Sequence, residues 1–144
     1  MFNIKKFEDN KLDRIMEIWK LSTIKAHAFI SKEYWEKNYD IVKNVYIPMA
    51  DTFVYDDGGE IKGFISIINN EFIGALFIDI DCQNLGIGSQ LIEYVSSRYR
   101  KLELAVYKDN QKATKFYQNH GFKIIREQKN EDSGFQEYIM EKIN

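Results

Sequence analysis

The feature that most constrains this chain is the segment Gln83-Asn84-Leu85-Gly86-Ile87-Gly88, which stands between an apolar run and a helical pattern. The apolar run covers 72–78, and the helical pattern repeats apolar residues through 91–95. A strand that turns at glycines and then opens a helix directs several main-chain N–H groups, and the positive end of the helix dipole, to one point. A Cβ at Gly86 or Gly88 would hold a ligand away from the backbone. The segment therefore predicts a site for phosphate oxygens.

Length and charge exclude several classes of protein. A chain of 144 residues fits a single domain over 1–144 with one core. Its net charge of -2 argues against a general nucleic-acid binder, which usually shows a basic face. No apolar run approaches the ~20 residues that cross a bilayer, and the N-terminus lacks the apolar core of a signal peptide. The single cysteine, Cys82, excludes an internal disulfide and suits a reducing cytosol, so we expect a cytoplasmic protein without membrane, nucleic-acid or metal partners.

Hydrophobic periodicity predicts a mixed α/β fold. β-rich or alternating runs predict strands at 2–7, 52–55, 60–68, 71–80, 102–106, 122–128 and 135–142. Helical spacing predicts helices at 10–24, 31–45, from the phosphate turn to about Arg100, and at 110–119. This order predicts a mostly antiparallel central sheet of about seven strands, flanked by about four helices, with a helical crossover near its centre.

Local signals mark two helix ends and one turn. Ser31 is a typical N-cap for the helix at 31–45. Gly121 follows the helix at 110–119 as a left-handed terminal residue, and Phe122 supplies the hydrophobic contact that accompanies such ends. The cluster Asp56-Asp57-Gly58-Gly59 predicts a tight turn between two strands.

Two common phosphate motifs fit the turn poorly. A P-loop needs Gly-Lys-Ser/Thr, whereas Ser89-Gln90 follows Gly88 and places no lysine on the phosphates. A dinucleotide-binding fingerprint needs a third glycine where Leu91 stands, together with repeating strand–helix units. A different phosphate ligand is therefore favoured.

A third motif fits better. Gln-x-x-Gly-x-Gly after a strand and before a helix resembles the coenzyme-A pyrophosphate loop of the GNAT superfamily of acyl-CoA-dependent N-acyltransferases. The segment Asn110-Gln111-Lys112-Ala113-Thr114-Lys115-Phe116-Tyr117, followed by Gly121-Phe122, is similar to a second segment of that family. The element order also matches the family's fold, so the resemblance covers nearly the whole chain.

The resemblance implies where acetyl-CoA binds. It lies in a cleft where the strands at 71–80 and 102–106 splay apart, and the family's pantetheine arm pairs with main-chain groups of one strand. Asn110 contacts the cofactor near its thioester, a role compatible with capping its helix. The cofactor-binding residues implied in this chain are Leu76, Phe77, Ile78, Gln83, Asn84, Leu85, Gly86, Ile87, Gly88, Ser89 and Asn110.

The implied activity is transfer of an acetyl group from acetyl-CoA to a primary amine by direct attack, with Tyr117 as general acid. A tyrosine of pKa ~10 stays protonated at neutral pH and can give its proton to a departing thiolate of pKa ~8.5. The transfer is uphill by roughly 2 kcal/mol if neither pKa is shifted. Without the surrounding motif, a core tyrosine beside Ala113 and Phe116 would be the favoured interpretation, and the motif favours the general acid.

The base is less defined. An amine of pKa ~10.4 is mostly protonated at pH 7, a handicap of about 4–5 kcal/mol. Some relatives place a glutamate where this chain has Ala105, and Glu103 lies two residues earlier on the same strand face. His27 stands in the helix-linking region that shapes the acceptor pocket in this family, and an imidazole suits a base at physiological pH. Asp79 is a further candidate, whereas His120 is expected to cap its helix.

The chain departs from the family pattern at two positions. Asn84 replaces a residue that is often basic, so phosphate binding relies on backbone donors, and Ile80 replaces the proline that commonly ends the strand. The acceptor stays open between a small-molecule amine and a protein amino group, and the aromatic segment from Trp19 to Trp35 is a candidate lining for its pocket. The alternative functions are a non-catalytic acyl-CoA-binding regulatory module and a protein-interaction domain.

Overall fold

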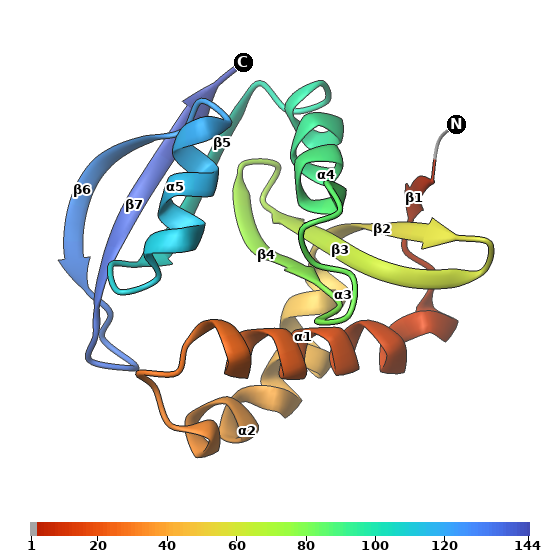
Figure 1. Cartoon of the computed structure of the whole chain (residues 1–144), viewed down its shortest axis with the longest axis horizontal. Helices are drawn as coiled ribbons and strands as arrows, with labels where there is room; N and C mark the ends of the chain where they lie inside the picture. The colour runs from red at the N-terminus through yellow and green to blue at the C-terminus, as the bar shows by residue number, and fades with distance from the viewer. Residues whose placement is uncertain (1–2) are drawn as a thin grey trace.

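Residues 3–144, which the computed structural model describes, form a mixed seven-stranded sheet in the order β1-β2-β3-β4-β5-β7-β6 (Figure 1). The strands are β1 (Ile4–Lys6), β2 (Asp51–Asp57), β3 (Glu60–Ile68), β4 (Phe72–Ile78), β5 (Lys101–Tyr107), β6 (Lys123–Lys129) and β7 (Gln136–Ile143). The longer helices are α1 (Leu12–Ala26), α2 (Lys32–Ile41), α4 (Ile87–Ser96) and α5 (Gln111–Asn119), and α3 (Ile47–Met49) is a single turn. Neighbouring strands are antiparallel except β4 and β5, so the predicted fold class is confirmed.

Most predicted boundaries hold within a few residues. β1 is shorter than the strand predicted at 2–7, of which Phe2 lies outside the described residues. β2 continues through Asp57, so the predicted turn narrows to Gly58-Gly59. α4 ends at Ser96, a few residues before the predicted end.

The helical segment after Ser31 extends beyond its predicted end. α2 stops at Ile41, and the chain continues through a π-helical turn at Val42–Tyr46 into α3. Pro48 lies in the first turn of α3, directly after the π-helical turn, and has no N–H to donate to the carbonyls of that turn. Ser31 caps α2 as predicted, because its side chain accepts a hydrogen bond from the main-chain N–H of Tyr34 at 3.3 Å.

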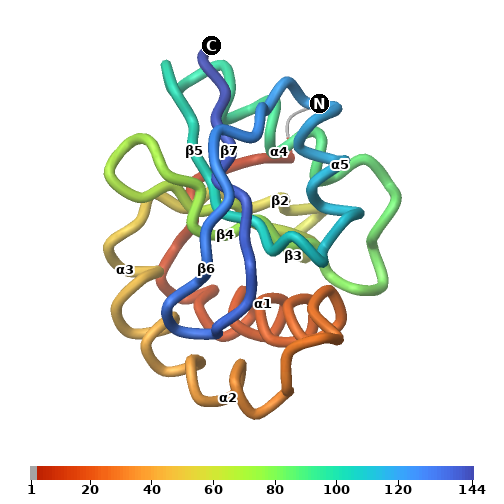
Figure 2. The backbone as a smooth tube through the Cα atoms, turned by 90° about the vertical axis from the view of Figure 1, so that its left-hand side faces the viewer, coloured from red at the N-terminus to blue at the C-terminus, as the bar shows by residue number. Residues whose placement is uncertain are grey.

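The sheet lies between two hydrophobic cores. α1 packs on one face, where Ile15 and Phe64 are fully buried, and α4 packs on the other, where Leu91 and Leu102 are fully buried. Figures 1 and 2 show α1 and α2 together on the side of the sheet opposite α4 and α5. Among residues 3–144, none of the helices has the length and apolar character that a membrane crossing requires.

The centre of the sheet opens between its two parallel strands. In the described chain, β4 and β5 pair only where Phe72 lies beside Glu103 and Ile73 beside Leu104. The register of β4 against β3 shifts at the same place and leaves Gly74 without a partner on β3. A bulge of this kind bends its strand, and β4 then diverges from β5. The splayed strands implied by the family resemblance are therefore present.

The end of α5 has the predicted geometry. Gly121 has φ +91, in the left-handed region that favours glycine. The N–H of Phe122 donates to the carbonyl of Tyr117 at 3.0 Å, and the N–H of Gly121 donates to that of Gln118 at 3.1 Å, which together make a Schellman ending. Phe122 is buried and its ring packs edge-on against Tyr117. This ending fixes the last turn of α5, and with it Tyr117.

Candidate active site

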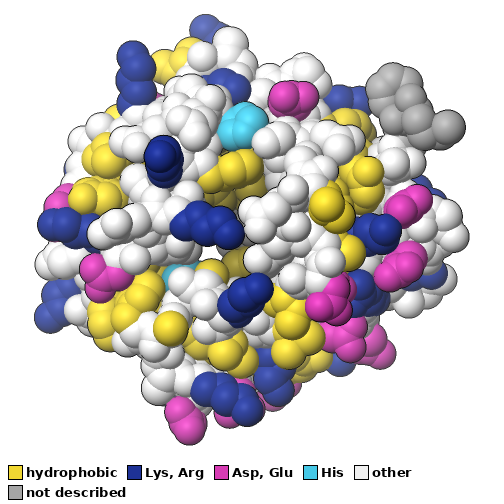
Figure 3. All heavy atoms as spheres, in the orientation of Figure 1, with side chains coloured by type: hydrophobic (Ala, Val, Ile, Leu, Met, Phe, Trp, Pro, Cys, Tyr) yellow, Lys and Arg dark blue, Asp and Glu magenta, His cyan; other side chains and the backbone are white. Residues whose placement is uncertain are grey.

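The opening between β4 and β5 continues as a cleft of about 900 Å³, lined from both strands, the loop after β4, α5 and the end of α1. Figure 3 shows hydrophobic side chains inside a hollow on the face turned to the reader, with Lys or Arg side chains beside it. Of the predicted site residues, these line the cleft: His27, Leu76, Phe77, Ile78, Gln83, Asn84, Gly86, Ile87, Gly88, Ser89, Asn110 and Tyr117. Leu85, which is 66% exposed, and Glu103 do not line it.

The glycine loop presents free donors at the start of α4. Gly86 is the N-cap residue with φ +82, and Asn84 has φ +66. Within residues 3–144, the main-chain N–H groups of 84–89 have no hydrogen-bond partner. These donors and the positive end of the α4 dipole form the kind of site that holds phosphate oxygens.

Within the protein itself the two glycines have different physical reasons, in addition to the clearance for a ligand that the sequence predicts. A Cβ on Gly86 would meet no atom within 4 Å, so its positive φ is the constraint. A Cβ on Gly88 would lie 3.3 Å from Cζ of Phe116, so Gly88 lets α5 approach the loop closely. Gly86 therefore sets the direction of the donors, and Gly88 sets the distance between α4 and α5.

His120 connects the loop to the end of α5. His120 is the C-cap residue of α5, as expected, but its ring extends to the loop, where Nε2 lies 3.0 Å from Oγ of Ser89. The same ring packs on Phe116 at 4.7 Å between centroids. Two cations, Lys25 and Lys112, also line the cleft and can attract an anionic ligand.

One edge of β4 faces the cleft. The N–H of Asp79 donates to the carbonyl of Lys62 on β3, and the main-chain groups of successive strand residues point to opposite edges. The groups of Ile78 and Leu76 therefore point to the cleft, whereas those of Phe77 point to β3. Phe77 contributes its side chain to the lining instead of a main-chain pairing site.

The carbonyl of Ile78 already has protein partners. It accepts hydrogen bonds from Oγ of Ser22 at 2.7 Å and from Nε2 of Gln83 at 3.3 Å. Ser22 lies on α1 and Gln83 opens the glycine loop, so this carbonyl ties both elements to the end of β4. The side chain of Gln83 therefore fixes the start of the loop.

Asn110 and His27 meet at the other end of the cleft. Oδ1 of Asn110 accepts the N–H of Ala113 at 3.2 Å, so Asn110 caps α5 as expected. Its Nδ2 lies 3.4 Å from Nε2 of His27, whose Nδ1 is 2.8 Å from the carbonyl of Thr23. A carbonyl only accepts, so Nδ1 carries the proton and Nε2 is the acceptor. Burial lowers the pKa of His27, and the hydrogen bond to the Thr23 carbonyl opposes this shift only in part. The lowered pKa keeps the ring neutral at pH 7.

Tyr117 presents an uncommitted hydroxyl to the cleft. Its ring packs against Phe116 and Phe122, with centroids 5.3 and 5.6 Å away. Within residues 3–144, no group forms a hydrogen bond with this hydroxyl, and burial raises the pKa of Tyr117. The phenol is therefore protonated at pH 7 and available to a bound ligand.

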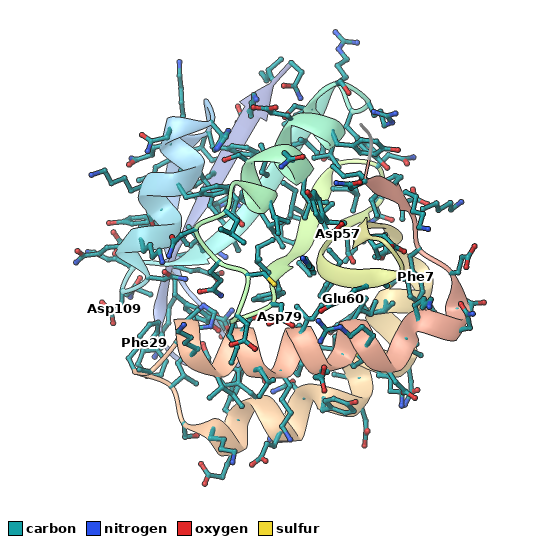
Figure 4. The ribbon with its side chains drawn as sticks, turned by 45° about the vertical axis from the view of Figure 1, so that its right-hand side comes forward. Phe7, Phe29, Asp57, Glu60, Asp79 and Asp109 are labelled. Carbon is teal, nitrogen blue, oxygen red and sulfur yellow. The ribbon has the colours of Figure 1, made fainter. Side chains whose placement is uncertain are left out.

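Two carboxylates predicted as base candidates lie elsewhere. Glu103 is in the stretch where β4 and β5 are still paired, beside Lys101 at 4.0 Å. Asp79 lies at the end of β4 next to α1, where its carboxylate pairs with the guanidinium of Arg14 at 2.5 Å (Figure 4). Burial alone would raise the pKa of Asp79, but the N–H of Asp81 and the Arg14 guanidinium outweigh it and hold the pKa below its usual range. The structure brings neither carboxylate to the cleft.

Sequence reasoning missed several side chains of the cleft, among them Tyr107, Asn130 and Glu137. Tyr107 ends β5 just past the predicted strand, and Asn130 and Glu137 come from β7 and the turn before it. Alternation along β7 puts Glu137 on one face with Ile139, which was the one available signal, because no motif marks either residue. The aromatic segment was a useful guide, since its two end residues Trp19 and Trp35 both line the cleft.

Comparison with known proteins identifies the family. A family model described as "Acetyltransferase (GNAT) domain" matches residues 22–143. Peptidyl-lysine N-acetyltransferase YiaC of Escherichia coli (strain K12) is 36% identical over 122 residues, which cover 85% of this chain and 84% of YiaC. The solution structure of apo-form YjaB from Escherichia coli has a TM-score of 0.84 at 26% identity, with 96% and 95% of the two chains covered.

A crystal structure of a PaiA N-acetyltransferase from Thermoplasma acidophilum in complex with coenzyme A has the same fold, with a TM-score of 0.79 at 21% identity and 98% of both chains covered. These likenesses agree with the splayed sheet, the glycine loop before α4 and the position of the cleft. The chain belongs to the GNAT family and is an N-acetyltransferase.

Proposed function

We propose that this enzyme transfers the acetyl group of acetyl-CoA to the ε-amino group of a lysine side chain in a protein, by direct attack of the amine. One observation supports the proposal most directly: the same cleft contains the glycine loop and the hydroxyl of Tyr117. Within residues 3–144, neither the main-chain N–H groups of 84–89 nor this hydroxyl has a hydrogen-bond partner. The activity in the name of YiaC, the relative with 36% identity, supports lysine as the acceptor.

The residues of the cleft fit coenzyme A. The N–H groups of the glycine loop would hold the pyrophosphate, with Lys25 and Lys112 as further positive charge. The free edge of β4 at Leu76 and the N–H of Ile78 would pair with the amides of the pantetheine arm. When bound, acetyl-CoA supplies an acetyl group activated as a thioester.

Tyr117 would protonate the departing sulfur. Its hydroxyl has no competing partner within residues 3–144, so it can donate to the thiolate as the C–S bond breaks. Burial raises its pKa, which makes complete transfer costlier than the roughly 2 kcal/mol for unshifted groups. A hydrogen bond to a charged acceptor is worth about 1.5–3 kcal/mol and offsets part of this cost.

The proton of the amine needs a separate acceptor. Nε2 of His27 is unprotonated, and its single lone pair faces Nδ2 of Asn110 at 3.4 Å, so it can take a proton directly or through water once Nδ2 turns from it to the cofactor. Its lowered pKa makes it a weaker base than a free imidazole. Asn110 would orient the acetyl end of the cofactor while its cap holds α5 in place.

The test is thiol release from acetyl-CoA with lysine peptides, for the wild type and for Tyr117→Phe. We expect kcat to fall about a hundredfold or more, with little change in the KM for acetyl-CoA, because the hydroxyl acts in the chemical step. The free energy of unfolding should not fall, because the hydroxyl forms no hydrogen bond within residues 3–144.

Tyr94→Phe is the matched control, since Tyr94 lies on α4, packs against Phe53 and Arg98, and does not line the cleft. Equal turnover in Tyr117→Phe and the wild type would reject the acid role. Coenzyme-A binding without thiol release for any lysine peptide would reject lysine transfer and support the acyl-CoA-binding module instead.

A further inference from the structure

Glu137 is a buried carboxylate near the part of the cleft where Tyr107 packs on His27. It is 7% exposed, lines the cleft, and is the one carboxylate among the buried residues of 3–144. On β7 it lies directly opposite Tyr107 of β5, and on the other side it pairs with Gln128 of β6. Directly opposite residues of antiparallel strands share a face, so Glu137 and the Tyr107 side chain lie on the same face of the sheet.

Neutral donors hold this carboxylate. Nε2 of Gln128 donates to one oxygen at 2.7 Å and Nδ2 of Asn130 donates to the other at 3.0 Å. The orientation of each amide is fixed by a hydrogen bond to its own oxygen. The amide oxygen of Gln128 accepts from Arg126. The amide oxygen of Asn130 accepts the main-chain N–H groups of Asp132 and Ser133. Each Glu137 oxygen therefore keeps a lone pair that no protein donor uses.

The negative charge lacks a direct counter-charge. Across residues 3–144, Glu137 forms no ion pair with a Lys, Arg or His side chain, and Arg126 reaches it only through Gln128. A charge removed from water without an opposite charge is expensive. Gln128 and Asn130 are neutral, so their two hydrogen bonds satisfy both oxygens without cancelling the net charge. The missing partner is therefore a cation from outside the chain.

The wall beside Glu137 is aromatic. Trp35 packs on His27 at 5.1 Å and on Tyr107 at 6.4 Å between centroids. Aromatic faces attract a cation, and they attract it more strongly away from water. Nε1 of Trp35 is buried without a hydrogen-bond partner among residues 3–144, and the residue itself is 9% exposed and lines the cleft.

From these contacts we infer that Glu137 binds the ammonium group of the acceptor, with Trp35 as part of the aromatic wall beside it. The site then selects an amine that arrives charged at the end of an apolar chain, as a lysine side chain does. Ala105 contributes no polar group to the cleft, so the carboxylate that lines the cleft comes from β7 instead of β5. The inference rests on the proposed function and adds the residue that recognises the acceptor.

The experiment uses the coenzyme-A complex, in which no acetyl group is present and no turnover occurs. Calorimetry compares a lysine peptide with the same peptide carrying 6-hydroxynorleucine, which has similar length but no charge. We expect the wild type to prefer lysine by about ten- to a hundredfold, the range for a hydrogen bond to a charged group. Glu137→Gln should reduce this preference to within about twofold, because it removes the charge and keeps the side-chain length, while its one amide oxygen still accepts from one of the two neighbouring amides.

Glu141→Gln is the matched control, because Glu141 lies on the same strand, contacts Lys101 and does not line the cleft, so it should keep the wild-type preference. A full lysine preference in Glu137→Gln, with normal coenzyme-A affinity, would overturn the inference. If that variant does not fold, the wild type decides alone, since equal affinity for the two peptides would overturn it as well. Acetyl transfer by the wild type, measured in parallel, reports on the proposed function independently.

Discussion

Gly86→Ala tests whether backbone conformation or space near the ligand is the constraint in the glycine loop. Gly86 has φ +82, and a Cβ there would meet no atom within 4 Å, so the expected cost is the left-handed strain of roughly 1–2 kcal/mol. If the free protein keeps the conformation, the whole cost appears in the free energy of unfolding. If the loop relaxes, the N–H groups of 84–89 lose their common direction, and part of the cost appears in coenzyme-A binding instead. The two losses should therefore add up to about 1–2 kcal/mol.

Both quantities can be measured on the same variant. With an unfolding entropy of about 2.1 cal/mol/K per residue, a 144-residue chain loses about 3–7 °C in Tm if the strain is all in the free protein. If it is all in binding, the Kd for coenzyme A rises about 5- to 30-fold. Thermal unfolding and calorimetric titration give the two parts.

Gly86→Asn is the control that separates strain from bulk. Asparagine also carries a Cβ but tolerates positive φ, as Asn84 does in the same loop at φ +66. Both replacements restrict the unfolded chain in a similar way, so their difference reports the strain in the loop. We expect Gly86→Asn to lose less than Gly86→Ala in the summed free energy. An equal or larger loss of coenzyme-A affinity in Gly86→Asn would refute the reasoning and make contact between the side chain and the ligand the cause.

Two further predictions concern the other end of the cleft. Burial lowers the pKa of His27 below its value in the unfolded chain, so the unfolded chain binds more protons at acidic pH. The contribution of His27 to the free energy of unfolding is therefore complete above pH ~6.5 and falls as the pH drops toward the folded pKa. The fall is at most about 1.4 kcal/mol per pH unit. His27→Gln should remove this part of the slope in urea unfolding between about pH 5 and 7.5, and an unchanged slope would contradict the assignment. Asn110→Ala should lower the free energy of unfolding by about 1 kcal/mol, because the helix cap is lost. Asn110→Asp should keep the stability, because a carboxylate also caps a helix well. It should nevertheless lower kcat/KM, because a carboxylate cannot donate a hydrogen bond to the cofactor. Equal stability losses in these two variants would show that the cap is not the cause.

The sequence predicted those parts of the site that local chemistry determines. The strand–turn–helix at 83–88, the cap at Asn110 and the ending at Gly121 each depend on residues close together in the chain, and all three have the predicted local structure. The order of the elements was equally readable, because each hydrophobic period is local. The extension of the second helical segment past Pro48 could not be predicted, because a proline near the start of a helix and a proline after the end of a helix look alike in sequence.

Contacts between distant segments could not be predicted. Glu103 was proposed because it shares a strand face with Ala105, but the two strands are still paired at Glu103 and diverge only beyond it. The position of the β4 bulge opposite β3 determines where β4 and β5 diverge, and no residue pattern in the sequence predicted that position. In the same way, the bond between Ser89 and His120 and the burial of Glu137 depend on how α5 and β7 pack, not on their own sequences.

The divergence of β4 from β5 also bears on how this protein avoids aggregation. A strand edge with unpaired N–H and C=O groups is a template on which another chain can add. Here the unpaired edges of β4 and β5 face each other inside the molecule, where Leu76 and Ile78 are half-buried. A narrow ligand such as a pantetheine arm can reach these edges more easily than a second protein strand can. The outer edge of this half of the sheet is β6, where all residues of Lys123–Lys129 are exposed and Lys123, Arg126, Glu127 and Lys129 carry charge. Unwanted strand pairing is thus opposed by charge outside and by burial inside.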